Sequence, residues 1–157
     1  MVLRVDVEAA ALEAVYGCAA EAVRAFAAEN LNHGPARYAA WIERTDELRD
    51  GLARLTGASS GDDIALLKNT TEGICLVAAG LDWQPDDEVV GVAHDFISNQ
   101  MVWEALRPRG VRYRRIDALT QDDPEGALID ALSRQTRLLA VSTVNYATGY
   151  RFDLASA

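Results

Sequence analysis

Basic residues, cysteines and long apolar runs are all scarce in this 157-residue chain. Lysine and arginine together number 15 against 24 aspartates and glutamates, which gives a net charge of −9 at pH 7. A nucleic-acid backbone is normally bound by clustered basic side chains, so this balance argues against a nucleic-acid partner. The one basic cluster, RPRGVRYRR at 107–115, is interrupted by strand-forming residues, and we expect it to form a solvated strand edge and loop.

The two cysteines, Cys18 and Cys75, lie in apolar helical surroundings and lack the spacing of metal ligands. We therefore expect buried free thiols, with no disulfide and no metal site. No apolar stretch approaches the roughly 18 residues of a membrane span. The first ten residues carry acids where a signal peptide would carry its apolar segment. These absences predict a soluble cytoplasmic protein without a membrane partner.

The residues that are present are sufficient for a packed core, because 50% of them are hydrophobic and the length is that of one ordinary domain. The first third predicts helices: an Ala- and Glu-rich stretch at 7–28, which Gly17 divides, and a second helix from Pro35 to Gly57. We assign residues 1–57 to this helical segment. Apolar side chains recur at helical spacing along the second helix and predict a face turned toward a core: Tyr38, Ile42, Leu48, Leu52 and Leu55.

Alternating strands and helices follow in residues 58–157. We expect strands at 63–68, 87–93, 110–117 and 136–144, and helices between them at 71–80, 98–106 and 124–133. Because parallel strands need crossover connections, this order predicts an α/β domain with a mostly parallel sheet covered by helices. The sequence stops just after the fourth expected strand, so we expect the domain to be partial.

Parallel sheets bind ligands beyond the carboxyl ends of their strands. At the first such turn, KNTTEG, Thr70 and Thr71 open a helix whose free amides and positive dipole end attract an anion. The alternative is an ordinary helix cap made by Asn69 or Thr70, with Glu72 in the first turn. The segment is neither a Walker A loop nor GxGxxG, which disfavours a Rossmann-type dehydrogenase or methyltransferase.

The second turn, AHDFISNQMVW, places Phe96 where an aromatic ring can cover a planar ligand, while Ser98 and Asn99 can cap the next helix. His94 and Asp95 are neighbours on a strand and point to opposite faces, which favours a surface histidine over an acid–base pair.

The fourth turn, STVNYATGYRFD, supplies hydrogen-bond donors at Asn145, Tyr146 and Thr148. Gly149 in the same segment permits the backbone to reverse.

Taken in order, KNTTEGI, HDFISNQMVW and TRLLAVSTVNYATGYRFD resemble the large domain of the class V aminotransferase family. These fold-type-I pyridoxal-phosphate enzymes include cysteine desulfurases and isopenicillin-N-epimerase-like proteins. The segments NLNHG, LARLTGA, GLDWQPDDEVV and RPRGVRYRRID agree in order and spacing, so the resemblance covers about residues 30–154. It implies pyridoxal 5′-phosphate as cofactor, an amino acid as substrate and a homodimer.

The resemblance also implies roles for individual residues. Thr70 and Thr71 match the pair that holds the cofactor phosphate, and Phe96 matches the position that stacks on the pyridine ring. Tyr146 falls where desulfurases place an asparagine that hydrogen-bonds the phenolic oxygen, and Asn145 is its neighbour. In the amino-terminal part, Asn32 and His33 match a stretch that borders the substrate pocket.

Two groups that the resemblance implies, an aspartate at the ring nitrogen and a lysine bonded to the cofactor, would come after the last residue of this sequence. The single lysine, Lys68, lies two residues before the phosphate turn, where its amine should not reach the cofactor's aldehyde carbon. We therefore assign no catalytic residue and expect an amino-terminal portion of an enzyme, a fragment or a truncated product, without turnover of its own. The alternative is a catalytically silent module that binds an anion or a partner protein.

Overall fold

The computed structural model describes residues 17–153, so the part of the first predicted helix before Gly17 lies outside the described residues. Contacts divide the described residues into two compact units, residues 17–67 and residues 68–153. Each unit is described by itself below.

The first unit consists of two α-helices and two short 3-10 turns. Helix α1 spans Gly17–His33, η1 spans Gly34–Arg37, α2 spans Tyr38–Thr56 and η2 spans Gly61–Asp63. Helix α1 continues five residues past its predicted end at 28 and stops where Gly34 takes a φ of 53°. Helix α2 ends as predicted at Gly57, whose left-handed φ of 75° lets its N–H reach the carbonyl of Ala53.

The predicted core-facing side of α2 is not buried in this unit. Ala53 is its one buried residue, and α1 has none. Side chains expected inside are exposed instead, for example Leu55 at 80% and Tyr38 at 61%. An edge-to-face contact of Phe26 with Trp41, with centroids 5.1 Å apart, links the two helices. The periodic apolar residues of α2 therefore predict one apolar face of the helix, but they do not predict that this face is buried within its own unit.

Two further expectations are corrected by the structure. The segment 63–68 is not a strand, because no strand of the described chain pairs with it. The thiols of Cys18 and Cys75 are free, as expected, but both residues are exposed, so the expected burial is wrong. Helix α3 buries Gly73, Ile74 and Ala78, and Cys75 lies on its other side.

The second unit contains a three-stranded sheet and three α-helices. The elements are α3 (Thr70–Gly80), β1 (Glu88–Val92), α4 (Ser98–Glu104), η3 (Arg107–Arg109), β2 (Arg112–Ile116), η4 (Ala118–Thr120), α5 (Pro124–Asp130) and β3 (Thr136–Ala140). The strand order is β2-β1-β3, and both pairings are parallel. This confirms the predicted parallel sheet, and β2 with its arginines forms an outer edge as expected.

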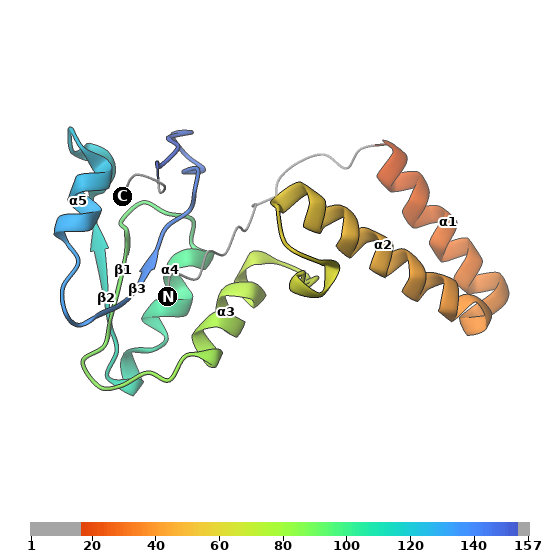
Figure 1. Cartoon of the computed structure of the whole chain (residues 1–157), viewed down its shortest axis with the longest axis horizontal. Coiled ribbons are helices and arrows are strands. Elements are labelled where there is room, and N and C mark those ends of the chain that lie inside the picture. Colours follow the sequence, from red (N-terminus) through yellow and green to blue (C-terminus); the bar gives the residue numbers. More distant parts are fainter. Residues whose placement is uncertain (1–16, 154–157) are drawn as a thin grey trace. The chain divides into compact units, whose positions relative to one another are not determined.

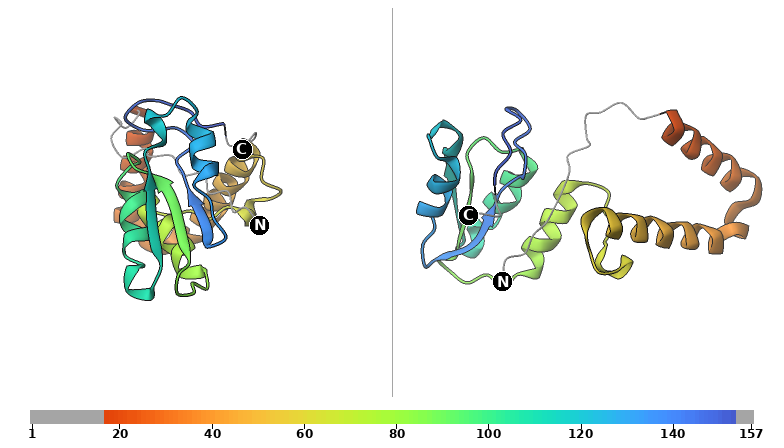
Figure 2. Two further views of the ribbon diagram at one scale, coloured as in Figure 1. Left: turned by 90° about the vertical axis from the view of Figure 1, so that its left-hand side faces the viewer. Right: turned by 45° about the horizontal axis from the view of Figure 1, so that its top comes forward.

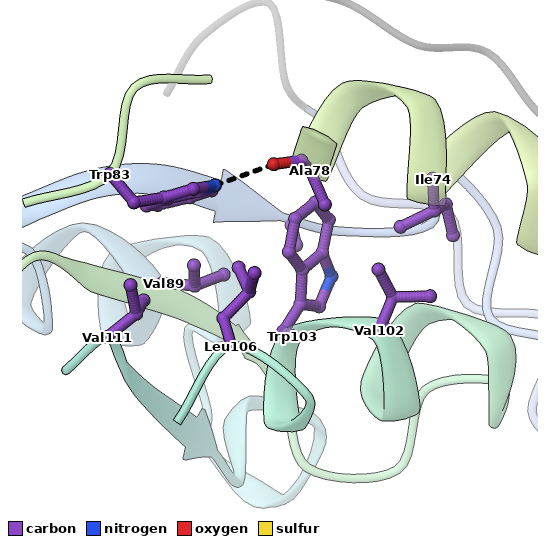
Figure 3. Packing of buried hydrophobic residues seen from close by; sticks show 9 residues of the cluster. Ile74, Ala78, Trp83, Val89, Val102, Trp103, Leu106 and Val111 are labelled. Carbon is purple, nitrogen blue, oxygen red and sulfur yellow. Dashed lines mark hydrogen bonds between the residues drawn. The ribbon is translucent and has the colours of Figure 1, made fainter. Parts of the chain in front are cut away.

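Helices cover both faces of this sheet, with α3 and α4 on one side and α5 on the other (Figures 1 and 2). Strand β1 is central, and all five of its residues are buried. On the α3–α4 side, Trp83 donates its indole N–H to the carbonyl of Ala78 at 2.7 Å, as Figure 3 shows. The same cluster contains Ile74, Val89, Val102, Trp103, Leu106 and Val111.

A smaller cluster fills the α5 side of the sheet, where Leu128 of α5 packs with Val92, Ala118 and Phe152. Burial of these apolar side chains at about 25 cal/mol per Å² holds the layers together. None of the helices in the described part of the chain combines the length and apolar character needed to cross a bilayer.

Candidate functional site

The candidate site lies at the carboxyl edge of the sheet. The turns after β1 and β3 lie at this edge, and α3 begins at the same end because it runs antiparallel to the strand that follows it (Figure 1). Helix α3 starts with a cap: the side-chain oxygen of Asn69 accepts the N–H of Glu72 at 2.9 Å. Of the two expected capping residues, Asn69 performs this role.

The cap leaves an anion-attracting end on α3. The N–H groups and hydroxyls of Thr70 and Thr71 have no hydrogen-bond partner among residues 17–153. Thr70 is half-buried and Thr71 is exposed, so both can meet a ligand from solvent. Helix capping and anion binding were alternative interpretations of this sequence, but the geometry allows both at once.

Lys68 and Glu72 form a local ion pair beside this helix end. The Glu72 carboxylate accepts the backbone N–H of Lys68 at 2.9 Å and lies 3.5 Å from its Nζ. The backbone hydrogen bond, helped by the nearby ammonium, holds the pKa of Glu72 below its usual value. The Lys68 side chain is 75% exposed, in agreement with the expected solvated lysine.

Asp95, at the turn after β1, connects three elements of the site. Its buried carboxylate accepts hydrogen bonds from the N–H of Phe96 at 2.7 Å and the side-chain amide of Asn99 at 2.8 Å. It also accepts the N–H and the hydroxyl of Ser142, at 3.1 and 2.6 Å, from the segment after β3. The carboxylate thus fixes the start of α4 and the ends of β1 and β3 relative to one another.

Phe96 and Tyr146, which come from the turns after β1 and β3, meet edge to face. Their ring centroids are 5.2 Å apart and the interplanar angle is 88°. Phe96 is half-buried and Tyr146 is 62% exposed, so the pair borders solvent. The structure therefore brings together two of the residues that the sequence selected from separate turns.

Asn145, which is 2% exposed, uses its side chain to hold its own loop. Its oxygen accepts the N–H of Ala147 and both the N–H and the hydroxyl of Thr148, all within 3.1 Å. Its amide donates to the carbonyl of His94 at 3.0 Å. Only the second amide hydrogen remains for a ligand, so the predicted cofactor contact of Asn145 is confined to that atom.

The other predicted residues are placed as follows. His94 is a surface residue, as expected, and its Nε2 lies 3.7 Å from Asp117. Neither Ser98 nor Asn99 caps α4, whose cap position is Ile97 without a side-chain hydrogen bond. Asn99 instead accepts the indole N–H of Trp103 and donates to Asp95, so the capping expectation is wrong.

Asn32 and His33 form the exposed end of α1 in the other unit, and their role at a substrate pocket stays a prediction. Sequence reasoning did not select Asp95 or Ser142 as site residues. A signal was present in both turns, because a short polar side chain that can bridge backbone groups lies within three residues of the end of each strand. The described residues contain no cluster of His, Cys, Asp and Glu side chains that can hold a metal ion.

A parallel sheet that combines a helix end with free donors and an aromatic pair at its carboxyl edge is typical of α/β proteins that bind a ligand at that edge. The profile of the family described as Aminotransferase class-V matches residues 10–157. The chain therefore belongs to the class-V aminotransferase family, as its motifs indicated.

Curated relatives agree with this assignment. A probable cysteine desulfurase of Methanothermobacter thermautotrophicus is 35% identical over 124 residues, which are 76% of this chain and 31% of the relative. A probable cysteine desulfurase of Mycolicibacterium paratuberculosis is 31% identical over 134 residues, 79% of this chain and 19% of the relative. The chain thus spans a third or less of the length of these relatives.

Solved structures show the same fold. The cystine C-S lyase C-DES in complex with cysteine persulfide superposes with a TM-score of 0.82 and 28% identity, over 90% of this chain and 39% of the lyase. A lysine-to-alanine variant of C-DES, with glycine covalently linked to its pyridoxal-phosphate cofactor, gives a TM-score of 0.78 and 27% identity, over 87% of this chain and 37% of that one. Pyridoxal phosphate is therefore the cofactor that this family and fold imply.

The residues at the sheet edge fit two parts of this cofactor. Two hydroxyls and two free N–H groups at the positive end of α3 match the needs of a phosphate dianion. The Phe96–Tyr146 pair, which borders solvent, offers an aromatic surface to a planar ring. The single lysine does not extend this fit, because its Nζ lies against Glu72.

Proposed function

We propose that this chain is the amino-terminal, cofactor-holding part of a pyridoxal-phosphate enzyme of the class-V family that acts on an amino acid. The observation that carries the proposal is the unsatisfied start of α3, at Thr70 and Thr71, at the same sheet edge as the Phe96–Tyr146 pair. Similarity to two probable cysteine desulfurases and to a cystine C-S lyase supports an amino-acid substrate.

In this proposal the start of α3 binds the phosphate through the hydroxyls and N–H groups of its two threonines. The helix dipole contributes about 0.3–1 kcal/mol to such an anion, and each hydrogen bond to a charged group contributes roughly 1.5–3 kcal/mol. Phe96 covers one face of the ring and excludes water from it, while Tyr146 supports Phe96 from its edge. The bound cofactor would supply an electron sink for the bond cleaved at the substrate's α-carbon.

The chain alone should not complete that chemistry. A lysine that bonds to the cofactor and moves a proton is needed, and the only lysine of the sequence is Lys68, which is paired with Glu72. A homodimer is also part of the proposal. The apolar side chains that α2 exposes, such as Ile42, Leu48 and Leu55, support it, because monomeric proteins rarely expose large apolar patches.

The phosphate cup is tested by calorimetric titration of the 157-residue chain with pyridoxine 5′-phosphate. This alcohol analogue has no aldehyde, so it cannot bond to Lys68 or to the terminal amine. We expect saturable binding that weakens by about tenfold or more when Thr70 or Thr71 is changed to alanine. The matched control is Thr120→Ala, an exposed threonine in η4, which should leave the affinity unchanged. Equal affinity in all variants would remove the cup from the proposal.

The source of the lysine is tested on protein purified from its native source, by borohydride reduction and peptide mapping. Cofactor fixed on a lysine outside these 157 residues would support the proposal. Cofactor fixed on Lys68 would overturn our assignment of that residue. A native mass near 17.0 kDa without lysine-bound cofactor would favour the silent anion- or protein-binding module instead.

A further inference from the structure

We propose that Asp95 is a positioning residue, whose carboxylate sets the ring of Phe96 against Tyr146 and so prepares the surface that receives the cofactor ring. The inference rests on the proposed function for its ligand, but the arrangement of the two rings is a property of the chain itself. Asp95 is not a catalytic residue in this proposal, because it acts through the backbone of its neighbours.

The contacts of Asp95 are directed at the segments that carry the two rings. One carboxylate oxygen accepts the N–H of Phe96 at 2.7 Å and the hydroxyl of Ser142 at 2.6 Å. The other oxygen accepts the N–H of Ser142 at 3.1 Å and the amide of Asn99 at 2.8 Å. Phe96 is thus held at its own backbone nitrogen, and Tyr146 is four residues beyond the second anchor.

The arrangement requires a side chain at position 95 whose two terminal atoms both accept hydrogen bonds. Each oxygen faces one backbone N–H, and a backbone N–H cannot turn away or become an acceptor. In Asp95→Asn, which keeps the shape, the new amide must point at one of those N–H groups. Either the Phe96 anchor or the Ser142 anchor is then lost, and the two turns are free to separate.

A second anchor keeps the loop that carries Tyr146 near the turn that carries Phe96. The amide of Asn145 donates to the carbonyl of His94, which directly precedes Asp95. Two connections, one at the carbonyl of His94 and one at the side chain of Asp95, therefore join the turn after β1 to the segment after β3. The side-chain oxygen of Asn145 stabilises its own loop by accepting the hydroxyl of Thr148. Asp95 differs because it also fixes the start of α4 through Asn99.

Strand β1 supplies a matched control at its other end. Glu88 is 6% exposed, against 4% for Asp95, and its carboxylate accepts the hydroxyl of Thr136 from β3 at 2.9 Å. Glu88 therefore also connects β1 to β3 through a buried carboxylate, but at the amino ends of the strands. A purely structural role of Asp95 predicts that Glu88→Gln and Asp95→Asn have the same consequences.

The first test uses the ligand-free, full 157-residue chain and the nuclear magnetic resonance shifts of the Tyr146 ring protons. An edge-to-face neighbour at 5.2 Å displaces these shifts by its ring current, and Phe96→Ala defines the value without that neighbour. We expect Asp95→Asn to move the Tyr146 shifts at least half-way to that value. Glu88→Gln should leave them in place, even where it lowers the melting temperature as much.

Ser142→Ala provides a second variant if Asp95→Asn does not fold. It removes the hydroxyl bond and keeps the Ser142 N–H, so a smaller displacement of the Tyr146 shifts in the same direction is expected. Unchanged Tyr146 shifts in either folded variant would overturn the inference.

The second test compares the affinities of the chain for pyridoxine 5′-phosphate and for inorganic phosphate. The ratio of the two isolates the contribution of the ring. We expect Asp95→Asn to lower this ratio by about tenfold and Glu88→Gln to leave it unchanged. A ratio that falls equally in both variants would refute a role specific to Asp95. Displaced Tyr146 shifts in Asp95→Asn, together with no analogue binding by the unaltered chain, would instead contradict the proposed function and leave the positioning role supported.

Discussion

Replacing Gly91 by alanine would place a methyl group where the sheet leaves no room for one. Gly91 lies in β1, the central strand, and pairs with Arg115 of β2 and Ala140 of β3. An added Cβ would lie 2.7 Å from the hydroxyl oxygen of Tyr113, 2.9 Å from its Cε2 and 3.1 Å from the carbonyl oxygen of Ala140. Tyr113 cannot simply swing aside, because its hydroxyl donates to the carbonyl of Asn99 at 3.3 Å and its ring packs against the α3–α4 core.

The expected cost of Gly91→Ala follows from two opposed effects. Overpacking of a filled core costs about 1–3 kcal/mol. Alanine restricts the unfolded chain more than glycine does, which returns roughly 0.5–1 kcal/mol. We therefore expect the free energy of unfolding to fall by about 1–2 kcal/mol. Urea unfolding followed by tryptophan fluorescence should show a lower midpoint with an unchanged slope, since the exposed surface stays the same.

A double-mutant cycle decides whether Tyr113 is the cause. In a Tyr113→Ala background two of the three close contacts are gone, so Gly91→Ala should cost less than about 0.5 kcal/mol there. An equal loss of unfolding free energy from Gly91→Ala in both backgrounds would refute this reasoning. The contact with the carbonyl of Ala140 would then be the cause of the strain.

Three other perturbations have expected outcomes. Asn69→Ala removes the cap of α3 and should lower the free energy of unfolding by about 1 kcal/mol in urea titrations. Burial, with a smaller contribution from the charge of Asp95, raises the pKa of Tyr113 to about 12. The stability that the neutral phenol contributes is therefore present below about pH 10 and is lost as the pH rises through about 12. Tyr113→Phe should remove the latest phase of an alkaline absorbance titration. Hydrogen bonds from the N–H of Asp153 and, to a smaller extent, from the hydroxyl of Tyr150 hold the pKa of Glu125 below 4.5. The contribution of the Glu125 carboxylate to folding stability is therefore present above pH 4.5 and is lost as the pH falls through the lower folded-state pKa. Glu125→Gln should make stability less sensitive to acid.

Each of these outcomes can be contradicted directly. An Asn69→Ala variant as stable as the parent would show that the cap is dispensable. A Tyr113→Phe titration that keeps its latest phase would assign that phase to another tyrosine; the pKa of Tyr150 is also raised, by its hydrogen bond to Glu125, which makes Tyr150→Phe the control. Unchanged acid sensitivity in Glu125→Gln would place the acid-labile contact elsewhere.

Elements whose sequence carries its own boundary signals were predictable. Strand β1 is an apolar run between the acidic turn before it and the polar turn after it, and it appears at 88–92 within its predicted range. Gly57 ends α2 because a left-handed backbone there favours glycine. The aromatic pair was predictable only as two separate residues, since the contact of Phe96 with Tyr146 depends on strands β1 and β3 being neighbours.

Features that depend on which distant part of the chain packs against a segment were not predictable. The run at 63–68 has strand-like composition, but a strand also needs a hydrogen-bonded neighbour, which the described sheet does not provide. Helix α3 is apolar on most of its surface, so its periodicity did not show that Cys75 would face outward. Asp95 was interpreted through its neighbour His94, whereas its partners are 47 positions away at Ser142 and within the next helix.

The two buried carboxylates at the opposite ends of β1, one in the strand and one in the turn after it, show how one region can serve both stability and a proposed site. At its amino end Glu88 meets Thr136 and lies 3.4 Å from Arg114 of β2, so a cation and a hydroxyl compensate its charge. Beyond its carboxyl end Asp95 is compensated by four hydrogen-bond donors, two of them the backbone N–H groups of Phe96 and Ser142 in the segments after β1 and β3. A cation at this second position would compete with the start of α3 for the phosphate that we propose binds there. Neutral donors fix the two turns without such competition, so a network of this composition suits the edge of the sheet at which we propose that the cofactor binds.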